Sequence, residues 1–232
     1  MAGNEVHIFV AIHMTIPKEL AERLAHTEYV VGSDEAGFGA WAGPLFVVSV
    51  CVHRDWTPPQ GLTDSKKLTE ARREALLLKL LDDPKVQHVV EVVEPPDIDR
   101  TGVYQANVAA HKAAHRGFDP EWGLHIADGN LDLGLDIESL PKADALVPAV
   151  SAASIFAKVL RDRWMVLLGK EFPGYGFEVH RGYGVPAHQA ALLKLGPCKA
   201  HRMSYAPVAA ARKGLPQPGS SVLDMLADLP QE

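Results

Sequence analysis

The chain has 232 residues, of which 47% are hydrophobic and 22% charged, with two cysteines and a formal net charge of -6. These values are typical of a globular protein with a sizeable core and argue against disordered and fibrous classes. Two cysteines form neither a disulfide framework nor a zinc cluster, and no stretch is apolar enough to span a bilayer, so we expect a cytoplasmic protein without signal peptide or membrane anchor.

Residues 1–27 are predicted to be an N-terminal extension of unknown role. Within it "EVHIFVAIHM" alternates like a strand and "PKELAERLAH" has helical spacing, although the same pattern also fits partial disorder. Two valine-rich runs follow, "EYVVGSD" and "PLFVVSVCVH", each bounded by Gly or Pro. They predict the opening hairpin of a sheet.

Helices and strands then alternate. Thr69 to Asp82 has helical spacing with Thr69 as a candidate N-cap, and "VQHVVEVVE" predicts a strand. The stretch "VYQANVAAHKAAHRG" predicts a helix that ends at Gly117. After it "WGLHIADGN" predicts a strand that stops at an Asp-Gly-Asn turn.

The last third is predicted to be helical. A long helix is expected over "LVPAVSAASIFAKVLRDRWMVLLGKEF", then a loop at "FPGYGFEVHRGYG" and a helix over residues 186–195. Residues 212–232 form a polar tail in which "SVLDMLADL" could be a short helix. The alternation predicts an α/β fold with a mixed sheet, beside which the C-terminal helices pack.

Charge is distributed unevenly along the chain. From Lys142 to Lys213 there are eleven Lys or Arg against four acidic residues, a local charge of +7, which leaves -13 for the remainder. Such a distribution suits a protein that holds metal ions in one place and a phosphate backbone in another. Chance segregation would explain the same counts.

Two adjacent acids, Asp34 and Glu35, follow the first predicted strand. Neighbours in an extended strand point to opposite faces, so both could not serve one site from within a regular strand. We therefore expect the chain to leave the strand there, with Gly32, Gly37 and Gly39 allowing the bend.

Two further acids lie at predicted element ends. Asp128 ends a strand, and Asp144 precedes the helix rich in small residues. Four carboxylates of this kind suit Mg²⁺ or Mn²⁺, and two such ions about 3.5 to 4 Å apart can drive phosphodiester cleavage. A single Asp at a strand end is more often a turn former, however, and spacing alone does not select these four from 29 acids.

Five motifs supply the missing specificity, because they occur in the order and spacing of the ribonuclease HII family, the type 2 ribonucleases H. They are "GSDEAGFGAWAGPL", "DSKKLTEARRE", "ADGN", "KADALVPAVSAASIFAKVLRDR" and "FPGYGFEVHRGYGVPAHQAALLKLGPCKAHRMSYAPV". The chain resembles this family from about Tyr29 to Val208. The resemblance implies a catalytic domain over 28–211 with a ribonuclease H-like fold, a mixed sheet flanked by helices with a C-terminal helical extension.

The resemblance also implies an activity and its site. Asp34, Glu35, Asp128 and Asp144 would be the metal-binding catalytic carboxylates, with Mn²⁺ or Mg²⁺ as cofactor. The enzyme would cleave the RNA strand of RNA–DNA hybrids and nick 5′ of a ribonucleotide embedded in duplex DNA, leaving 5′-phosphate and 3′-hydroxyl ends. It would act as a monomer, on nucleic acid and not on a membrane.

Substrate contacts follow from the same motifs. In the family a Gly-Arg-Gly turn grips the ribonucleotide and a downstream Tyr stacks at the RNA-to-DNA junction; here these are Gly37, Phe38 and Gly39, and Tyr183. Phe38 departs from the pattern, since it replaces the Arg and removes its charge. The substitution therefore bears on the efficiency of cleavage at RNA–DNA junctions more than on phosphodiester hydrolysis itself.

Basic residues are candidates for phosphate contacts. Lys66 and Lys67 in "DSKKL" would lie near the site. Lys158 and Arg161, three residues apart on one helix face, would follow the DNA backbone together with Arg181. The alternative is that all five are merely solvated.

Three alternative functions remain open. Type 3 enzymes, whose turn also lacks this Arg, prefer continuous hybrids, so the Phe38 turn leaves room for a hybrid-only nuclease, although the rest of the chain resembles type 2. A hybrid-binding protein that has lost cleavage would not need the complete carboxylate set, and a small-molecule metal phosphatase would not need the basic C-terminal third.

Overall fold

The computed structural model describes residues 16–134 and 136–213. Its centre is a mixed five-stranded sheet in the order β3-β2-β1-β4-β5. The strands are β1 (Tyr29–Ala36), β2 (Leu45–His53), β3 (Val86–Val93), β4 (Gly123–Asp128) and β5 (Glu138–Leu140). β1, β2 and β3 pair antiparallel, whereas β4 runs parallel to both β1 and β5. The predicted hairpin and mixed sheet are confirmed.

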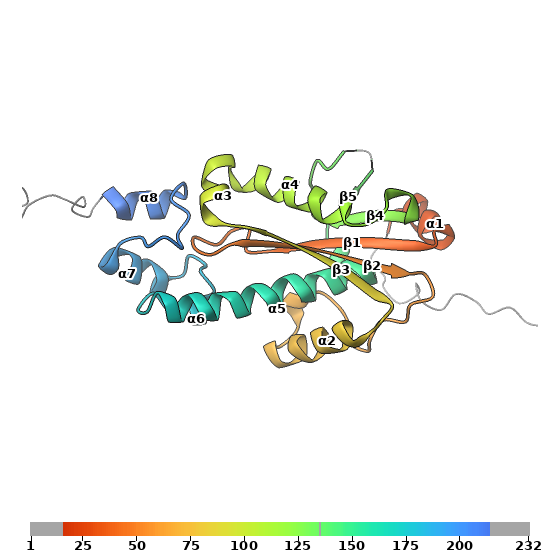
Figure 1. Ribbon diagram of the computed structural model, residues 1–232, viewed down its shortest axis with the longest axis horizontal. Coiled ribbons are helices and arrows are strands. Elements are labelled where there is room, and N and C mark those ends of the chain that lie inside the picture. Colours follow the sequence, from red (N-terminus) through yellow and green to blue (C-terminus); the bar gives the residue numbers. More distant parts are fainter. Residues whose placement is uncertain (1–15, 135, 214–232) are drawn as a thin grey trace, which may run out of the picture.

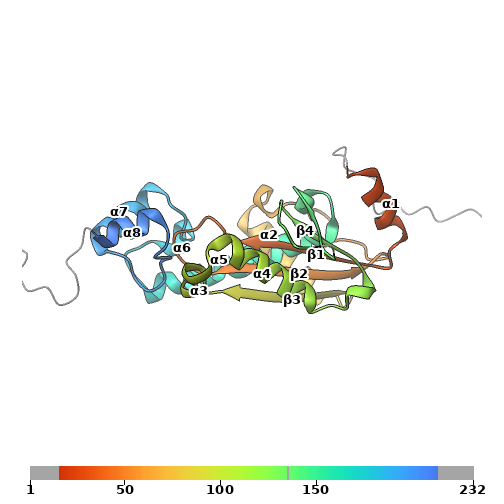
Figure 2. The same cartoon turned by 90° about the horizontal axis from the view of Figure 1, so that it is seen from above.

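Helices cover both faces of the sheet (Figure 1). One face carries α3 (Pro95–Thr101) and α4 (Val103–Arg116), and the other α2 (Glu70–Asp82) and the long α5 (Pro148–Glu171). A C-terminal group of α6 (Phe177–His180), α7 (Pro186–Leu195) and α8 (Ala206–Lys213) lies beyond one end of the sheet, and α1 (Lys18–His26) lies at the opposite end (Figure 2). The β1–β2 loop reaches toward the C-terminal group.

Small residues let α5 lie directly on β1. A Cβ atom at Gly32 would clash with the backbone of Ala149 and Val150 at the start of α5. Ala152 and Ala153 in the next turn are also fully buried. Gly32 therefore serves close helix–strand packing, and the expectation that it helps the chain to bend is wrong.

Most predicted elements are confirmed, with instructive differences. Thr69 caps α2, since its Oγ1 accepts the Arg72 N–H at 3.4 Å, and α7 has the predicted bounds. Gly117 ends α4 with an ordinary φ of -68°, so glycine is needed there for its contact with Val89 and not for a left-handed turn.

Other elements were not predicted. α3 begins at Pro95, where proline suits a first helical turn, α6 forms within the expected loop, and β5 pairs only three residues. α1 matches the expected helix and buries Leu20 and Leu24. The N-terminal strand and the tail helix fall outside the described residues, and α8 extends past the boundary drawn at 211.

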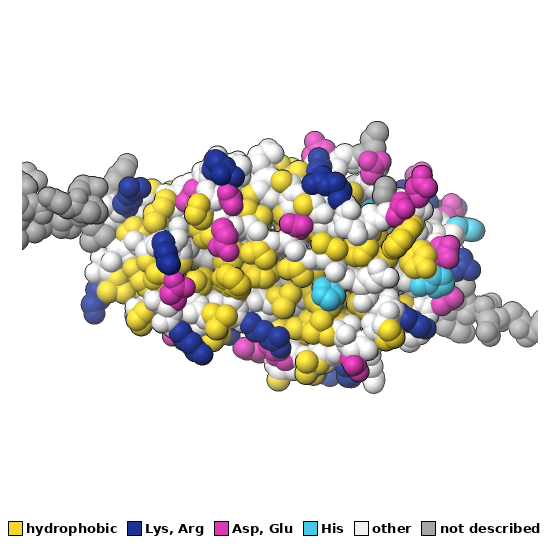
Figure 3. Space-filling view, viewed as in Figure 1, with side chains coloured by type: hydrophobic (Ala, Val, Ile, Leu, Met, Phe, Trp, Pro, Cys, Tyr) yellow, Lys and Arg dark blue, Asp and Glu magenta, His cyan; other side chains and the backbone are white. Residues whose placement is uncertain are grey.

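The face formed by the edge strand β3 is shown in Figure 3. Hydrophobic side chains run along its middle, and basic and acidic side chains are interspersed around them. On the face shown in Figure 3, the described residues form no continuous positively charged patch that would suit a phosphate backbone. Within the described ranges, no helix combines the length and apolarity needed to cross a membrane.

Candidate active site

The parallel register between β1 and β4 places Asp34 beside Asp128. The last paired residues of these two strands are Ser33 and Ala127, so the two aspartates follow as neighbours where β4 ends. Pairing between β1 and β2 nevertheless continues past Asp34 and Glu35. The prediction that the chain leaves the strand here is therefore wrong, and the two side chains point to opposite faces.

A 3-10 helix, Ala143–Ala145, brings a third carboxylate, Asp144, to the same place. The Asp144 N–H donates to Asp128 Oδ1 at 3.3 Å, which fastens this helix to the end of β4. Lys142 precedes it in a left-handed conformation, φ 64°, that is uncommon for residues other than glycine. One oxygen each from Asp34, Asp128 and Asp144 lies within 4.8 Å of the others.

Glu35 stands beside this cluster and is held from the opposite face. Its Oε2 lies 3.3 Å from Nε2 of His111 on α4. Burial and, after it, the charge of Glu35 raise the pKa of both Asp34 and Asp128, so the carboxylate is still close to them. The structure thus groups three of the four predicted carboxylates and sets the fourth at their edge.

The electrostatics of the cluster favour an added cation. Burial, followed by the charges of Glu35 and Asp128, raises the pKa of Asp34 well above its usual value. Burial, followed by the charges of Asp128 and Asp64, raises the pKa of Asp144 to about 6. Buried carboxylates that repel one another gain most from a divalent ion, and an all-oxygen donor set suits Mg²⁺ or Mn²⁺.

The cluster opens onto a cavity of about 300 Å³ with a charged lining. The lining residues are Asp64, Lys66, Lys67, Asp128, Lys142, Asp144 and Ala145. Lys66 Nζ lies 3.9 Å from Asp144 Oδ2, and Lys67 Nζ lies 3.8 Å from Asp64 Oδ2. Burial alone would lower the pKa of Lys66, but the surrounding carboxylates raise it. Lys66 therefore stands at the site as a charged group, and the side chains of both lysines are largely exposed.

Asp64 and His111 were missed in the sequence. Asp64 opens the "DSKKL" motif, but its side chain also accepts the Lys66 N–H at 2.9 Å, so the sequence signal is that of an ordinary cap. His111 is one of several histidines in an Ala-rich helix, and its partner lies 76 residues away. Neither contact has a local sequence signature.

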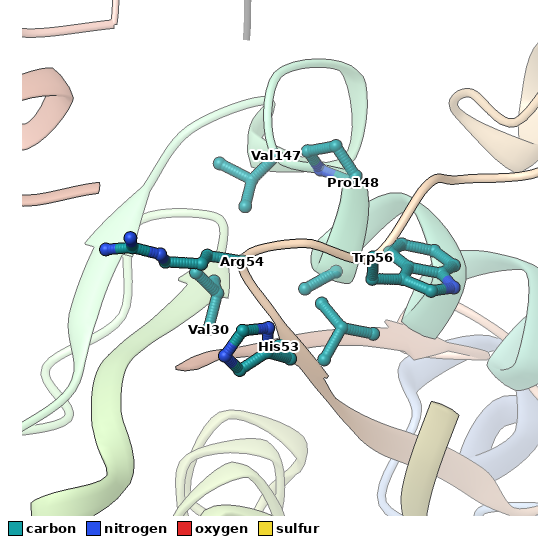
Figure 4. Close-up of a pocket in the computed structure, with 8 residues that line it drawn as sticks. Val30, His53, Arg54, Trp56, Val147 and Pro148 are labelled. Carbon is teal, nitrogen blue, oxygen red and sulfur yellow. The ribbon is translucent and has the colours of Figure 1, made fainter. Parts of the chain in front are cut away.

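A much smaller cavity lies away from the carboxylates (Figure 4). It measures about 20 Å³ and lies where the end of β2 meets the start of α5, ringed by Val30, Trp56, Val147 and Pro148. That volume holds about one water molecule. Because no carboxylate lines it, it is not a competing site.

The predicted substrate turn lies in the β1–β2 loop. Gly37 has φ 99°, and a Cβ there would clash with the Arg161 side chain. The Phe38 carbonyl accepts from Arg202 Nη1 at 2.9 Å and from the Tyr205 hydroxyl at 2.7 Å, while its ring is 37% exposed. At Gly39 a Cβ would meet no atom within 4 Å. Packing therefore explains Gly37 but leaves Gly39 open to a bound molecule.

Arg161 is not the surface contact we expected. It is fully buried, and its guanidinium donates to the carbonyl oxygens of Ala42, Pro44 and Arg181 at 3.0 to 3.2 Å. It also lies 5.3 Å from the centroid of the Tyr183 ring. The structure therefore corrects this prediction: Arg161 ties the β1–β2 loop to the Tyr183 segment and does not face solvent.

The two other basic residues of this group converge on a buried acid, Asp162. Lys158 Nζ lies 2.8 Å from Asp162 Oδ1, and Arg181 Nε lies 3.9 Å from the same oxygen. Arg181 also pairs with Glu70 at 3.2 Å. Both are partly exposed, so they remain available to a phosphate only by sharing their charge with these acids.

Comparison with known proteins identifies the family. A sequence model of ribonuclease HII matches residues 31–121 and 128–208. The ribonuclease HII of Azorhizobium caulinodans is 46% identical over 90% of this chain and 81% of its own length. That of Mycobacterium avium is 43% identical over 87% of each. The chain belongs to the ribonuclease HII family.

Solved structures agree with this ribonuclease HII fold. The ribonuclease H2 of Pyrococcus horikoshii superposes with a TM-score of 0.64 at 26% identity, covering 80% of this chain and 97% of that one. RNase HII from Archaeoglobus fulgidus, solved as a complex with PCNA, gives 0.63 at 25% identity over 84% and 99%. Bst-RNase HIII in complex with Mn²⁺ gives 0.65 at 20% identity over 81% and 71%, a likeness of fold alone.

Membership of the ribonuclease HII family establishes the general type of reaction. As a ribonuclease HII, the protein is an endoribonuclease of the ribonuclease H type that hydrolyses phosphodiester bonds. Its family acts on RNA–DNA hybrids and needs a divalent metal, and the oxygen cluster of Asp34, Asp128 and Asp144 fits that need.

Proposed function

We propose that this ribonuclease HII hydrolyses the RNA strand of RNA–DNA hybrids and also nicks 5′ of single ribonucleotides in duplex DNA, leaving 5′-phosphate and 3′-hydroxyl ends. One observation carries the proposal: the oxygens of Asp34, Asp128 and Asp144 lie within 4.8 Å of one another at the mouth of a lysine-lined cavity. We place this activity in a cytoplasmic monomer.

The carboxylates have the task of holding Mn²⁺ or Mg²⁺ and not of moving protons. Asp34, Asp128 and Asp144 provide the oxygen ligands, and Glu35 completes the set from its edge. Two bound ions would activate the attacking water and stabilise the leaving 3′-oxygen. Asp144 is kept in place by its own backbone bond to Asp128, so the ligand geometry is set before a cation arrives.

The surrounding residues would bind and read the nucleic acid. Lys66 and Lys67 offer charge to the phosphates on the cavity rim. Discrimination for RNA requires a contact to the 2′-hydroxyl, and the backbone of Gly37 to Gly39 can approach a ribose at the open side of Gly39. Tyr183, braced by Arg161 and partly exposed, can stack on a sugar or base at the junction.

A hybrid-only nuclease is the second candidate, and Phe38 favours it. The exposed ring offers no charge where the family pattern has Arg, so a contact that distinguishes a lone ribonucleotide is weakened while the carboxylates are unaffected. A binding protein without cleavage would have no need of the full carboxylate cluster, and a phosphatase for small molecules would have no need of the basic residues around it.

Two labelled substrates test these candidates: a continuous RNA–DNA hybrid and a DNA duplex with one ribonucleotide, each assayed with Mg²⁺ and with Mn²⁺. We expect cleavage of both, with the products mapped by their end groups. Absence of cleavage in every condition would refute the nuclease. Cleavage of the hybrid alone would select the second candidate.

A further inference from the structure

Behind Glu35, a buried histidine network of Ser33, His111, His115 and His125 runs between α4 and the sheet. From Glu35 Oε2 the contacts are 3.3 Å to His111 Nε2 and then 2.8 Å from His111 Nδ1 to Ser33 Oγ. Ser33 Oγ lies 2.8 Å from His115 Nε2, and His115 Nδ1 lies 2.9 Å from His125 Nδ1. All four members are at most 4% exposed.

The direction of the hydrogen bond between His111 and Glu35 follows from the chemistry of Glu35. A carboxylate oxygen accepts, so His111 donates to Glu35 from Nε2. Ser33 Oγ lies 2.8 Å from both His111 Nδ1 and His115 Nε2 and links the two rings. Reversing the direction would set a lone pair of His111 against the carboxylate.

The other end of the network is buried as well. Burial, followed by the charges of His125 and His111, lowers the pKa of His115 to about 2, so His115 is neutral. At His125 burial lowers the pKa, while a hydrogen bond to the backbone of Asp119 raises it in part.

If this network served only to fill space between α4 and the sheet, it would cost more free energy than apolar side chains. Burying polar groups between a helix and a sheet costs free energy unless each is satisfied, and apolar side chains would fill the space without that cost. What the network achieves in exchange is one fixed N–H, on the buried side chain of His111, directed at one oxygen of Glu35.

We propose that His111 is a positioning residue, held by the rest of the buried histidine network, which fixes one oxygen of Glu35 and leaves the other for the cluster of Asp34, Asp128 and Asp144. The proposal rests on the proposed function, in which these carboxylates bind a divalent ion, and adds the group that orients one of them. A free glutamate must lose rotamer entropy when it binds an ion, whereas a carboxylate already held by a donor has lost it beforehand.

Two substitutions distinguish the roles of the two ring nitrogens of His111. His111→Gln places an amide near the position of Nε2 and keeps a donor for Glu35, whereas His111→Asn matches Nδ1, keeps a bond to Ser33 and cannot reach Glu35. The readout is Mn²⁺ binding by titration calorimetry without nucleic acid. We expect His111→Asn to weaken binding about tenfold or more and His111→Gln to stay within about threefold of wild type.

The same pair in a Glu35→Gln background is the decisive control. If His111 acts through Glu35, the two variants bind Mn²⁺ alike once that carboxylate is gone. Equal affinities of His111→Asn and His111→Gln in the wild-type background would overturn the proposal. So would a difference that persists in Glu35→Gln. Thermal unfolding of each variant shows whether it folds. If a His111 variant does not fold, Ser33→Ala replaces it in the comparison. Ser33→Ala removes the group that supports His111 but leaves His111 facing Glu35, so we expect a loss of Mn²⁺ affinity between those of the two His111 variants.

This experiment is independent of the cleavage assay. If wild type and Asp34→Asn bind Mn²⁺ equally, the proposed metal site fails. If wild type binds Mn²⁺ through the carboxylates but the two His111 variants do not differ, only the positioning role fails.

Discussion

The backbone N–H of Asp144 donates to Asp128 Oδ1, and the two carboxylates, 16 residues apart in the chain, lie within reach of one cation. This bond holds two like charges together that would otherwise separate. Burial and the neighbouring acids raise the pKa of both groups, so the folded protein without metal carries an electrostatic cost at this site. The arrangement that prepares the site for a metal therefore lowers stability in its absence.

Neutralising Asp144 should stabilise the metal-free protein. Its pKa is about 6 in the folded state against an ordinary 3.8, so the native state binds more protons than the unfolded chain between these values. Stability must then fall as pH rises from about 4 to 6. We expect Asp144→Asn to raise the free energy of unfolding by roughly 1 to 3 kcal/mol at pH 7.5 and to change little at pH 4.

Urea unfolding in the presence of EDTA at the two pH values measures this difference. Saturating Mn²⁺ should stabilise wild type more than Asp144→Asn, because only wild type keeps the complete ligand set. A variant that is less stable than wild type at pH 7.5 in EDTA would contradict the electrostatic account.

Asp34 should be essential for turnover but not for binding. Asp34→Asn keeps the shape of the site and removes one anionic ligand, so we expect kcat on the hybrid to fall by more than about a hundredfold while hybrid affinity stays measurable. Single-turnover cleavage and a fluorescence-anisotropy titration give the two quantities. Asp82→Asn, an exposed acid at the end of α2, is the matched control and should cleave like wild type. Turnover near wild type in Asp34→Asn would remove Asp34 from the metal site.

Sequence reasoning located the site where the backbone itself fixes the geometry. Asp128 ends β4, and Asp34 follows the last residue of β1 that pairs with β4, so the parallel register of these neighbouring strands brings the two carboxylates together. The long helix could be read from its period, and the small residues at its start indicated close packing. The β1–β2 hairpin followed from two valine-rich runs and the glycines between them.

The features that could not be predicted from the sequence depend on which face of a helix packs against which neighbouring element. Helical spacing correctly relates Lys158 to Arg161, but spacing does not say that the C-terminal segment covers Arg161 and leaves Lys158 partly exposed. The contact between Glu35 and His111 likewise exists only because α4 docks on β1 with one particular face inward. Neither is a local property of the chain.

Arg161 and Lys158 should therefore differ sharply when replaced. Arg161→Met leaves three buried carbonyl groups without their donor, and we expect a loss of about 3 to 5 kcal/mol in the free energy of unfolding. Lys158→Met removes one partner of the buried Asp162, but Arg73 and Arg181 remain within 4.0 Å of that carboxylate, so the change should cost less than about 2 kcal/mol. Chemical unfolding monitors both. Equal losses would show that Arg161 is not the tie between the β1–β2 loop and the Tyr183 segment.

Phe38 should set the balance between the two proposed substrates. Its carbonyl is fixed by Arg202 and Tyr205 whatever its side chain, so a substitution changes the exposed group and leaves the turn in place. An Arg there can add a charge-assisted hydrogen bond near the junction, worth about 1.5 kcal/mol or more, which corresponds to roughly tenfold in rate.

We accordingly expect Phe38→Arg to raise kcat/KM for the single-ribonucleotide duplex about tenfold relative to the continuous hybrid. Phe38→Leu keeps an apolar side chain and is the matched control, with a substrate ratio close to that of wild type. Both ratios come from paired assays in the same metal and salt, because phosphate contacts are salt-dependent. An unchanged ratio in Phe38→Arg would mean that the missing charge does not limit junction cleavage, and that the backbone of Gly37 to Gly39 alone reads the ribose.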